Sequence, residues 1–183
     1  MDWKIFEQKF EDKGIKIVDW LNNEYCKINS ARVNPNIFNS FLVEAYGEKM
    51  PLNQVATVNM VDARTANIKP FDGSLGKSIV TTLNDGKLNA NIQLDGSLVK
   101  VAFPPITEEN RKTNAKKAKE YLEQAKVQIR NIRTDVQKEI KKIVGLSEDL
   151  VKSYENNLDK LTKEWNAKIE KIYTTKEAEL MKV

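Results

Sequence analysis

Apolar residues recur at alternating three- and four-residue spacing in three long stretches of the chain, residues 2–28, 107–144 and 148–181. Such spacing collects the apolar side chains on one side of an α-helix, so each stretch predicts a long helix with a buried stripe. The expected stripes are Phe6, Phe10, Ile17, Leu21 and Ile28; Ala118, Leu122, Ala125, Ile129, Ile132, Val136 and Ile143; and Leu150, Tyr154, Leu158, Leu161, Trp165, Ile169 and Ile172.

Residues 36–103 follow a different pattern, with short segments of strand character separated by turn residues. The last of them alternates cleanly, because Val99, Val101 and Phe103 fall on one face of a strand. Asp95-Gly96 lies between two such segments and predicts a β-hairpin turn. The predicted strands are 41–46, 55–60, 65–68, 91–94 and 98–103, and residues 74–83 predict one short helix.

Together these elements predict an α+β fold, in which a long antiparallel three-helix bundle carries a small inserted β/α/β domain. We expect the bundle to comprise residues 1–31 and 105–183, and the inserted domain to comprise residues 32–104. The chain enters and leaves the insert through two connections, so the insert can swivel about a two-stranded hinge. The expected hinge residues are Val33, Asn34, Pro35, Phe103, Pro104 and Pro105.

A stripe of basic residues runs along the middle predicted helix, one position away from the apolar stripe. One residue is about 100° around a helix, so the basic stripe flanks the packed side and faces outward. Residues 105–145 hold 11 Lys and Arg against six Asp and Glu, whereas the rest of the chain is nearly balanced. The stripe consists of Lys112, Lys116, Lys119, Lys126, Arg130, Arg133 and Lys141. It predicts a face that binds a polyanion such as RNA, the alternative being an ordinary solvated helix surface.

Composition disfavours an enzyme. The chain has no histidine, which removes the commonest general base and the usual nucleophile-activating partner. It also lacks a Gly-rich phosphate loop and a cysteine cluster. We therefore expect no enzymatic activity, no cofactor and no small-molecule substrate.

The single cysteine, Cys26, fits a reducing compartment. No apolar run approaches the roughly 20 residues that span a bilayer, and the charged start at residues 2–4 is unlike a signal peptide. These features predict a cytoplasmic monomer without a membrane partner.

Short motifs occur in order along nearly the whole chain. They are KINSARVNP at 27–35, EAYG at 44–47, PLNQ at 51–54, DART at 62–65, FD at 71–72, PPITEENRK at 104–112, RNIR at 130–133 and KEAELM at 176–181. In sequence and separation these motifs resemble the bacterial ribosome recycling factor family.

The resemblance implies an L-shaped, roughly tRNA-like protein whose helical domain binds large-subunit ribosomal RNA of the 70S ribosome after termination. Elongation factor G, using GTP, would then act on the factor to separate the subunits, and the factor itself would catalyse no covalent chemistry. Arg130 and Arg133 fall on the family's rRNA-contacting arginines, and Arg32 falls on its basic position near the hinge. The expected rRNA-binding residues are Arg130, Arg133, Arg32, Lys126, Lys119, Lys116 and Lys112.

Three positions depart from the family's pattern. Asn29 stands where the family usually has arginine, Ala31 replaces a common glycine, and Thr134 stands where a further basic residue is frequent. Asn29 and Thr134 therefore offer less basic charge to RNA than the family's usual residues, whereas Ala31 changes no charge.

The alternative function is a structural or scaffold coiled-coil protein whose insert is a peptide-binding module. Both functions need the same apolar stripes, so periodicity does not separate them. The confinement of the basic excess to one helix favours RNA binding, because a scaffold has no reason to concentrate it there.

Overall fold

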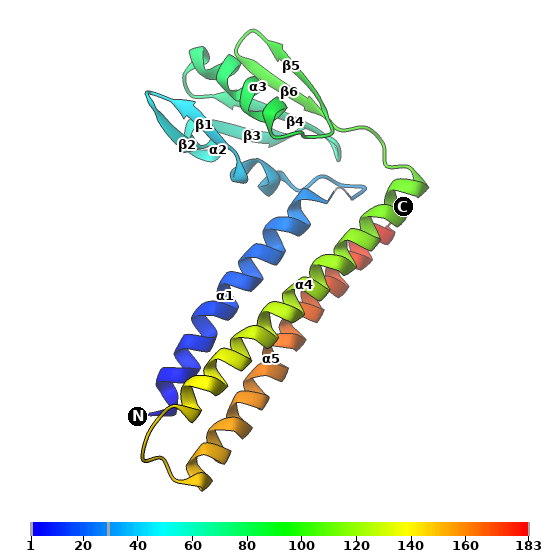
Figure 1. The fold of residues 1–183 in the computed structure, drawn as a ribbon. Coiled ribbons are helices and arrows are strands. Elements are labelled where there is room, and N and C mark those ends of the chain that lie inside the picture. Colours follow the sequence, from blue (N-terminus) through cyan, green and yellow to red (C-terminus); the bar gives the residue numbers. More distant parts are fainter. Residues whose placement is uncertain (1, 29, 183) are drawn as a thin grey trace. The chain divides into compact units, whose positions relative to one another are not determined.

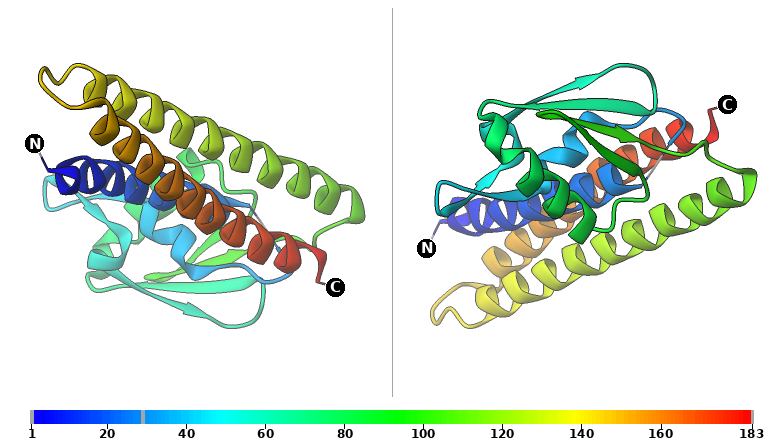
Figure 2. Two further views of the ribbon diagram at one scale, coloured as in Figure 1. Left: turned by 90° about the horizontal axis from the view of Figure 1, so that it is seen from below. Right: turned by 90° about the horizontal axis from the view of Figure 1, so that it is seen from above.

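Three long helices lie side by side in the computed structural model, which describes residues 2–28 and 30–182 (Figure 1). They are α1 (Trp3–Lys27), α4 (Glu108–Lys141) and α5 (Glu148–Met181). The chain runs in one direction along α1 and α5 and in the opposite direction along α4, as the three views agree (Figures 1 and 2). The predicted α+β class and antiparallel three-helix bundle are confirmed.

The described chain divides into two compact units. The first comprises residues 1–25 and 115–178, and the second comprises residues 26–114 and 179–183. The first unit holds the paired parts of the long helices, and the second holds all of the strands.

The buried residues of α4 follow the predicted apolar stripe, with a difference at its C-terminal end. Ile143 is only partly buried, because α4 ends at Lys141 and the chain then turns through Gly145, whose φ is +90°. Ile140 occupies the last buried position of the helix instead. The buried residues of α4 are Ala118, Leu122, Ala125, Ile129, Ile132, Val136 and Ile140.

The stripe of α5 is confirmed over its central part and differs at two positions. Residues from Tyr154 to Ile169 at the predicted positions are buried. Leu150 is 40 % exposed, because it lies in the first turn of α5 at one end of the bundle. Ile172 is half-buried and lines a groove between α1 and α5.

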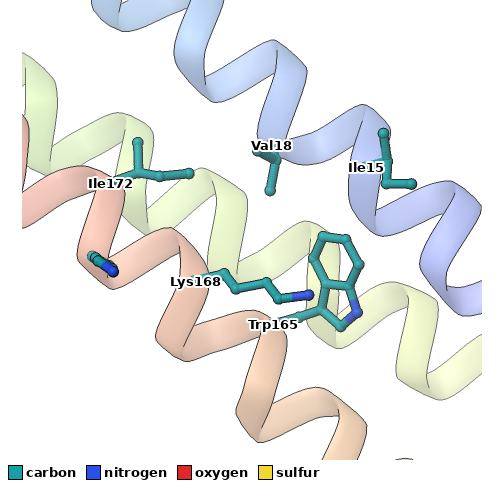
Figure 3. A pocket seen from close by; sticks show the side chains of 6 residues that line it. Ile15, Val18, Trp165, Lys168 and Ile172 are labelled. Atoms are coloured by element: carbon teal, nitrogen blue, oxygen red, sulfur yellow. The ribbon is translucent and has the colours of Figure 1, made fainter.

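This groove has a volume of about 330 Å³ and is lined by Ile15, Val18, Trp165, Lys168, Lys171 and Ile172 (Figure 3). Its floor is the indole of Trp165, which is 4 % exposed and carries the Lys168 ammonium 4.1 Å from the ring centroid. The indole packs directly on the backbone of α1 at Gly14, where an added Cβ would lie 2.8 Å from the ring carbons. Gly14 is therefore a packing position, and the groove follows from how the two helices meet around a large aromatic side chain.

Replacing Gly14 with alanine is expected to lower the melting temperature. Alanine favours the helix over glycine by about 1 kcal/mol. However, overfilling a packed contact typically costs about 1–3 kcal/mol, and the rigid indole of Trp165 has no flexible end to move aside. Thermal unfolding measures the difference. The matched control is Asn23→Ala on the exposed side of α1, which gains helix propensity without a clash and should not lower the melting temperature.

The strands form two antiparallel sheets. β1 (Leu42–Ala45) pairs with β2 (Glu48–Pro51) through a turn in which Tyr46 and Gly47 both have positive φ. The larger sheet has the order β3-β4-β6-β5. Its strands are β3 (Ala56–Met60), β4 (Thr65–Pro70), β5 (Asn91–Asp95) and β6 (Leu98–Ala102). The predicted hairpin at Asp95-Gly96 joins β5 to β6, with Gly96 at a φ of +63°.

Three short helical segments and one helix of ten residues complete the second unit. The short ones are η1 (Pro35–Ser40), α2 (Leu52–Val55) and η2 (Gly73–Leu75), and the longer one is α3 (Gly76–Asp85). α3 packs against β1, β5 and β6 and buries Ile79 and Leu83. The core of this unit forms between that helix and inward residues of the larger sheet such as Ile68, Val99 and Val101.

Candidate RNA-binding face

Helix α4 packs against both α1 and α5 in the first unit, and side-chain contacts define which of its sides each neighbour covers. Towards α1, the Tyr25 hydroxyl donates to the backbone oxygen of Ala118 at 2.8 Å, and the Trp20 and Tyr121 rings meet edge-on. Burial disfavours the phenolate and raises the pKa of Tyr25 above its ordinary value. The side of α4 away from both neighbours is open to solvent.

The opposite flank of α4 contacts α5 through polar groups. The Gln137 amide donates to Glu155 at 3.0 Å, and the Arg133 guanidinium forms an ion pair with Asp159 at 2.7 Å. The hydrogen bond from Gln137 and the charge of Lys141 lower the pKa of the Glu155 carboxyl. These contacts fix the α4–α5 flank as a line of charged and amide groups.

The predicted basic residues of α4 lie on this flank and on the open side next to it. At 100° per residue their positions span an arc of roughly 100° around the helix axis. Arg133 and Lys126 lie nearest to α5 and are half-buried. The exposed ones are Lys112, Lys116, Lys119, Arg130 and Lys141.

Ion pairs divide these basic residues into two groups. Besides Arg133, two lysines contact carboxylates of α5, Lys126 with Glu170 at 3.0 Å and Lys141 with Glu155 at 3.5 Å. Lys112 makes a loose and highly exposed contact with Glu108, at 3.8 Å. In the part of the chain that the structure describes, Lys116, Lys119 and Arg130 have no ion pair and present their full charge to solvent. We call these seven residues of α4 the basic face: Lys112, Lys116, Lys119, Lys126, Arg130, Arg133 and Lys141.

The acidic residues of α5 are the part of this site that sequence reasoning missed. Glu155, Asp159 and Glu170 lie within a narrow arc on one side of α5, and all three contact the basic face. Their spacing is visible in the sequence as a second, acidic stripe. Glu120 and Glu123 also lie exposed on α4 among the lysines and lower the positive charge of that part of the helix.

The predicted hinge residues lie in the second unit, and two of them belong to its core. Val33 and Phe103 are both 5 % exposed. Their backbone N–H groups donate to the neighbouring carbonyls of Ala63 and Arg64, both at 2.8 Å. The chain enters and leaves residues 32–104 through two connecting segments. The structure brings these two segments together at the β3–β4 turn, where a backbone hydrogen bond holds each of them.

The remaining predicted hinge residues lie near the surface. So do Arg32 and the described positions at which the sequence departs from the family's pattern. Pro104 and Pro105 are exposed, whereas Asn34 is half-buried and its side chain accepts a hydrogen bond from the Asn36 N–H at the start of η1. Arg32 is exposed. Thr134 is exposed and its hydroxyl donates to the backbone oxygen of Arg130, so it adds no charge to the basic face. Ala31 is half-buried, and Asn29 lies outside the described residues.

Within residues 2–28 and 30–182, no helix combines the length and the apolar character needed to cross a membrane. The same part of the chain holds no group of three or more His, Cys, Asp or Glu side chains that could bind a metal ion.

Comparison with known proteins identifies the family. The ribosome recycling factor family model matches residues 21–181. The ribosome-recycling factor of Ureaplasma parvum is 38% identical over 183 residues, covering all of both chains. That of Leuconostoc mesenteroides is 42% identical over 163 residues, covering 89% of this chain and 90% of the relative.

Solved structures agree with the sequence relatives. A solution structure of a ribosome recycling factor superposes with a TM-score of 0.82 at 28% identity, covering 100% of this chain and 99% of that one. A second match, with a TM-score of 0.66 at 32% identity and full coverage of both chains, comes from models for the T. thermophilus ribosome recycling factor and the E. coli elongation factor G bound to the E. coli post-termination complex. The chain therefore belongs to the ribosome recycling factor family, a family of non-enzymatic translation factors.

Proposed function

We propose that this protein binds post-termination ribosomes through the basic face of α4, which contacts large-subunit ribosomal RNA, and that elongation factor G with GTP then uses it to separate the subunits. Family membership supports this proposal. So does the 32% identical solved relative, which is described bound to the post-termination complex together with elongation factor G.

The observation that carries the RNA contact is the group of exposed basic side chains on the open side of α4. Lys116, Lys119 and Arg130 are exposed and have no ion pair within the described residues, so they are available to phosphates without first breaking an internal contact. Each phosphate neutralised by such a side chain releases condensed counterions, which makes binding favourable and salt-dependent. Packing of the bundle does not require these unpaired charges.

Arg130 and Arg133 add a directional component to this field. They are three residues apart on one helix, so their side chains start about 5–6 Å from each other. A guanidinium is a planar fork that bonds two phosphate oxygens at once and stacks on unpaired bases. The pair is therefore suited to structured RNA, whereas the lysines supply attraction that is less dependent on geometry.

Recycling also requires that force applied to one part of the protein reach another. We propose that the protein acts as two domains, one formed by residues 1–31 and 105–183 and the other by residues 32–104. Elongation factor G would push on the factor, and the two connecting segments between the domains would transmit the motion. Two observations support this transmission of motion. The described chain divides into two compact units, and both connecting segments are held at the same β3–β4 turn. The anchoring at Val33 and Phe103 favours a pivot between these residues and the three-helix bundle.

Sedimentation of the full chain with vacant 70S ribosomes tests the proposal. The protein should pellet with ribosomes at low salt and less so as salt rises, and addition of elongation factor G with GTP, but not with GDP, should produce free subunits. A scaffold protein with the same stripes would remain in the supernatant. That result, or binding insensitive to salt, would contradict the RNA contact.

A further inference from the structure

Arg133 is held by a carboxylate before any RNA arrives. Its Nε donates to Oδ1 of Asp159 at 2.9 Å, and its Nη2 lies 2.7 Å from the same oxygen in an ion pair. The side chains are 36% and 50% exposed, so the pair lies at the edge of the α4–α5 flank. The contact therefore lies on the guanidinium edge that joins Nε and Nη2. The other edge, formed by Nη1 and the second hydrogen of Nη2, keeps three donors.

The other cations of the basic face are held differently. Lys126 contacts both Glu123 and Glu170, at 3.8 and 3.0 Å, and an ammonium is a point charge that loses no directional edge in such contacts. Arg130 is exposed and makes no ion pair in the described chain. Arg133 is thus the one arginine of the RNIR motif whose guanidinium is fixed in orientation and still has an unused edge.

We propose that Asp159 is a positioning residue for ribosome binding, which holds the Arg133 guanidinium along the α4–α5 flank so that its unused edge meets a phosphate of ribosomal RNA. This inference rests on the proposed function of the basic face. An arginine that is free in solution loses rotamer freedom when it binds a phosphate, and one already held by a carboxylate loses less. Asp159 therefore acts on affinity through Arg133 without contacting RNA itself.

The Asp159 carboxylate has two opposite effects on the affinity for RNA, and the larger effect decides what happens when the carboxylate is removed. Its negative charge lowers the attraction of the face for phosphates, but both partners are partly solvated, where such effects are small and salt-screened. Preordering one long side chain corresponds to roughly a 2- to 10-fold gain in affinity. Positioning therefore prevails, and removing this acid should weaken binding to a polyanion although the protein becomes more positive.

The test measures the affinity of the full-length chain for vacant 70S ribosomes at several salt concentrations. Asp159→Ala is expected to weaken binding about 2- to 10-fold. Asp159→Asn, which keeps an oxygen acceptor but no charge, should weaken it less. The matched control is Glu164→Ala, which removes the same charge from an exposed position of α5 outside the basic face and should leave binding unchanged or slightly tighter. Melting temperature and helical circular dichroism should not change, because exposed ion pairs add little to stability.

The decisive comparison combines Asp159→Ala with Arg133→Ala. If Asp159 acts through Arg133, the double variant binds no more weakly than Arg133→Ala alone. The inference is overturned if Asp159→Ala binds as tightly as the parent protein or tighter, or if its weaker binding persists in the Arg133→Ala background. Failure of the proposed function has a different signature, since Arg133→Ala itself would then bind ribosomes normally.

Discussion

The double variant Arg130→Ala, Arg133→Ala is expected to bind 70S ribosomes more than about 100-fold more weakly than the parent protein, since each hydrogen-bonded charge interaction is worth roughly 1.5–3 kcal/mol. The slope of log affinity against log salt should also fall by about two, one for each phosphate that the variant no longer neutralises. Arg130 is exposed and Arg133 is only half-buried, so the fold should tolerate both changes.

A matched control separates the site from the overall charge. Lys4→Ala with Lys16→Ala removes the same charge from exposed positions on α1, outside the basic face. This control should bind within about threefold of the parent protein, because exposed charges beyond a Debye length of about 8 Å are largely screened at physiological salt. Equal weakening in the two double variants would mean that net charge, and not this face, governs binding.

The bundle could be predicted from the sequence because its signal is local. The three- and four-residue spacing of Ala118 to Val136 depends only on helix geometry, and all of these stripe residues are buried as expected. The end of α4 was predicted less well. Ile143 continues the heptad spacing in the sequence, but the chain leaves the helix at Lys141 and turns at Gly145, so Ile140 is the last buried residue.

Features that depend on how two elements meet were not predictable in the same way. The short strand β2 was not expected, because Glu48 and Lys49 are exposed and show no apolar alternation, and its pairing with β1 defines it. Gly14 weakens the helical pattern of α1 when read alone, and only the indole of Trp165 packed on it explains its presence. β2 is defined by its hairpin neighbour β1, whereas Gly14 is explained by a side chain far away in the sequence.

The candidate site likewise has features that could be predicted from the sequence and features that could not. The positions of the basic residues on α4 follow from the sequence, and their side of the helix was expected. The pairing of Arg133 with Asp159 and of Lys126 with Glu170 depends on the relative register of α4 and α5, which the apolar stripes do not specify to within one turn. The sequence therefore predicted the charge of the face but not which of its cations are held by carboxylates.

Locking the two proposed domains together is expected to abolish subunit splitting while leaving ribosome binding within about threefold of normal. Splitting requires elongation factor G to do work on a bound factor, and a hinge passes that work on only if the domains reorient. The variant carries one engineered cysteine within residues 2–25 and one within residues 36–102, in a Cys26→Ser background. Pairs are selected by their ability to oxidise to an intramolecular disulfide.

The same protein with its disulfide reduced is the matched control, because it differs from the locked form by a single bond. Light scattering with elongation factor G and GTP should show splitting in the reduced form only, and sedimentation should show that both forms bind ribosomes. Val33 and Phe103 are buried, and their backbone N–H groups are hydrogen-bonded to the β3–β4 turn, so these two residues move with residues 32–104. A disulfide between the two proposed domains should therefore stop any reorientation of one against the other. If the oxidised form splits ribosomes at the full rate, no hinge is needed, and the shape of the bound factor is sufficient. Loss of binding on oxidation would instead mean that the face on α4 itself needs the second domain to move.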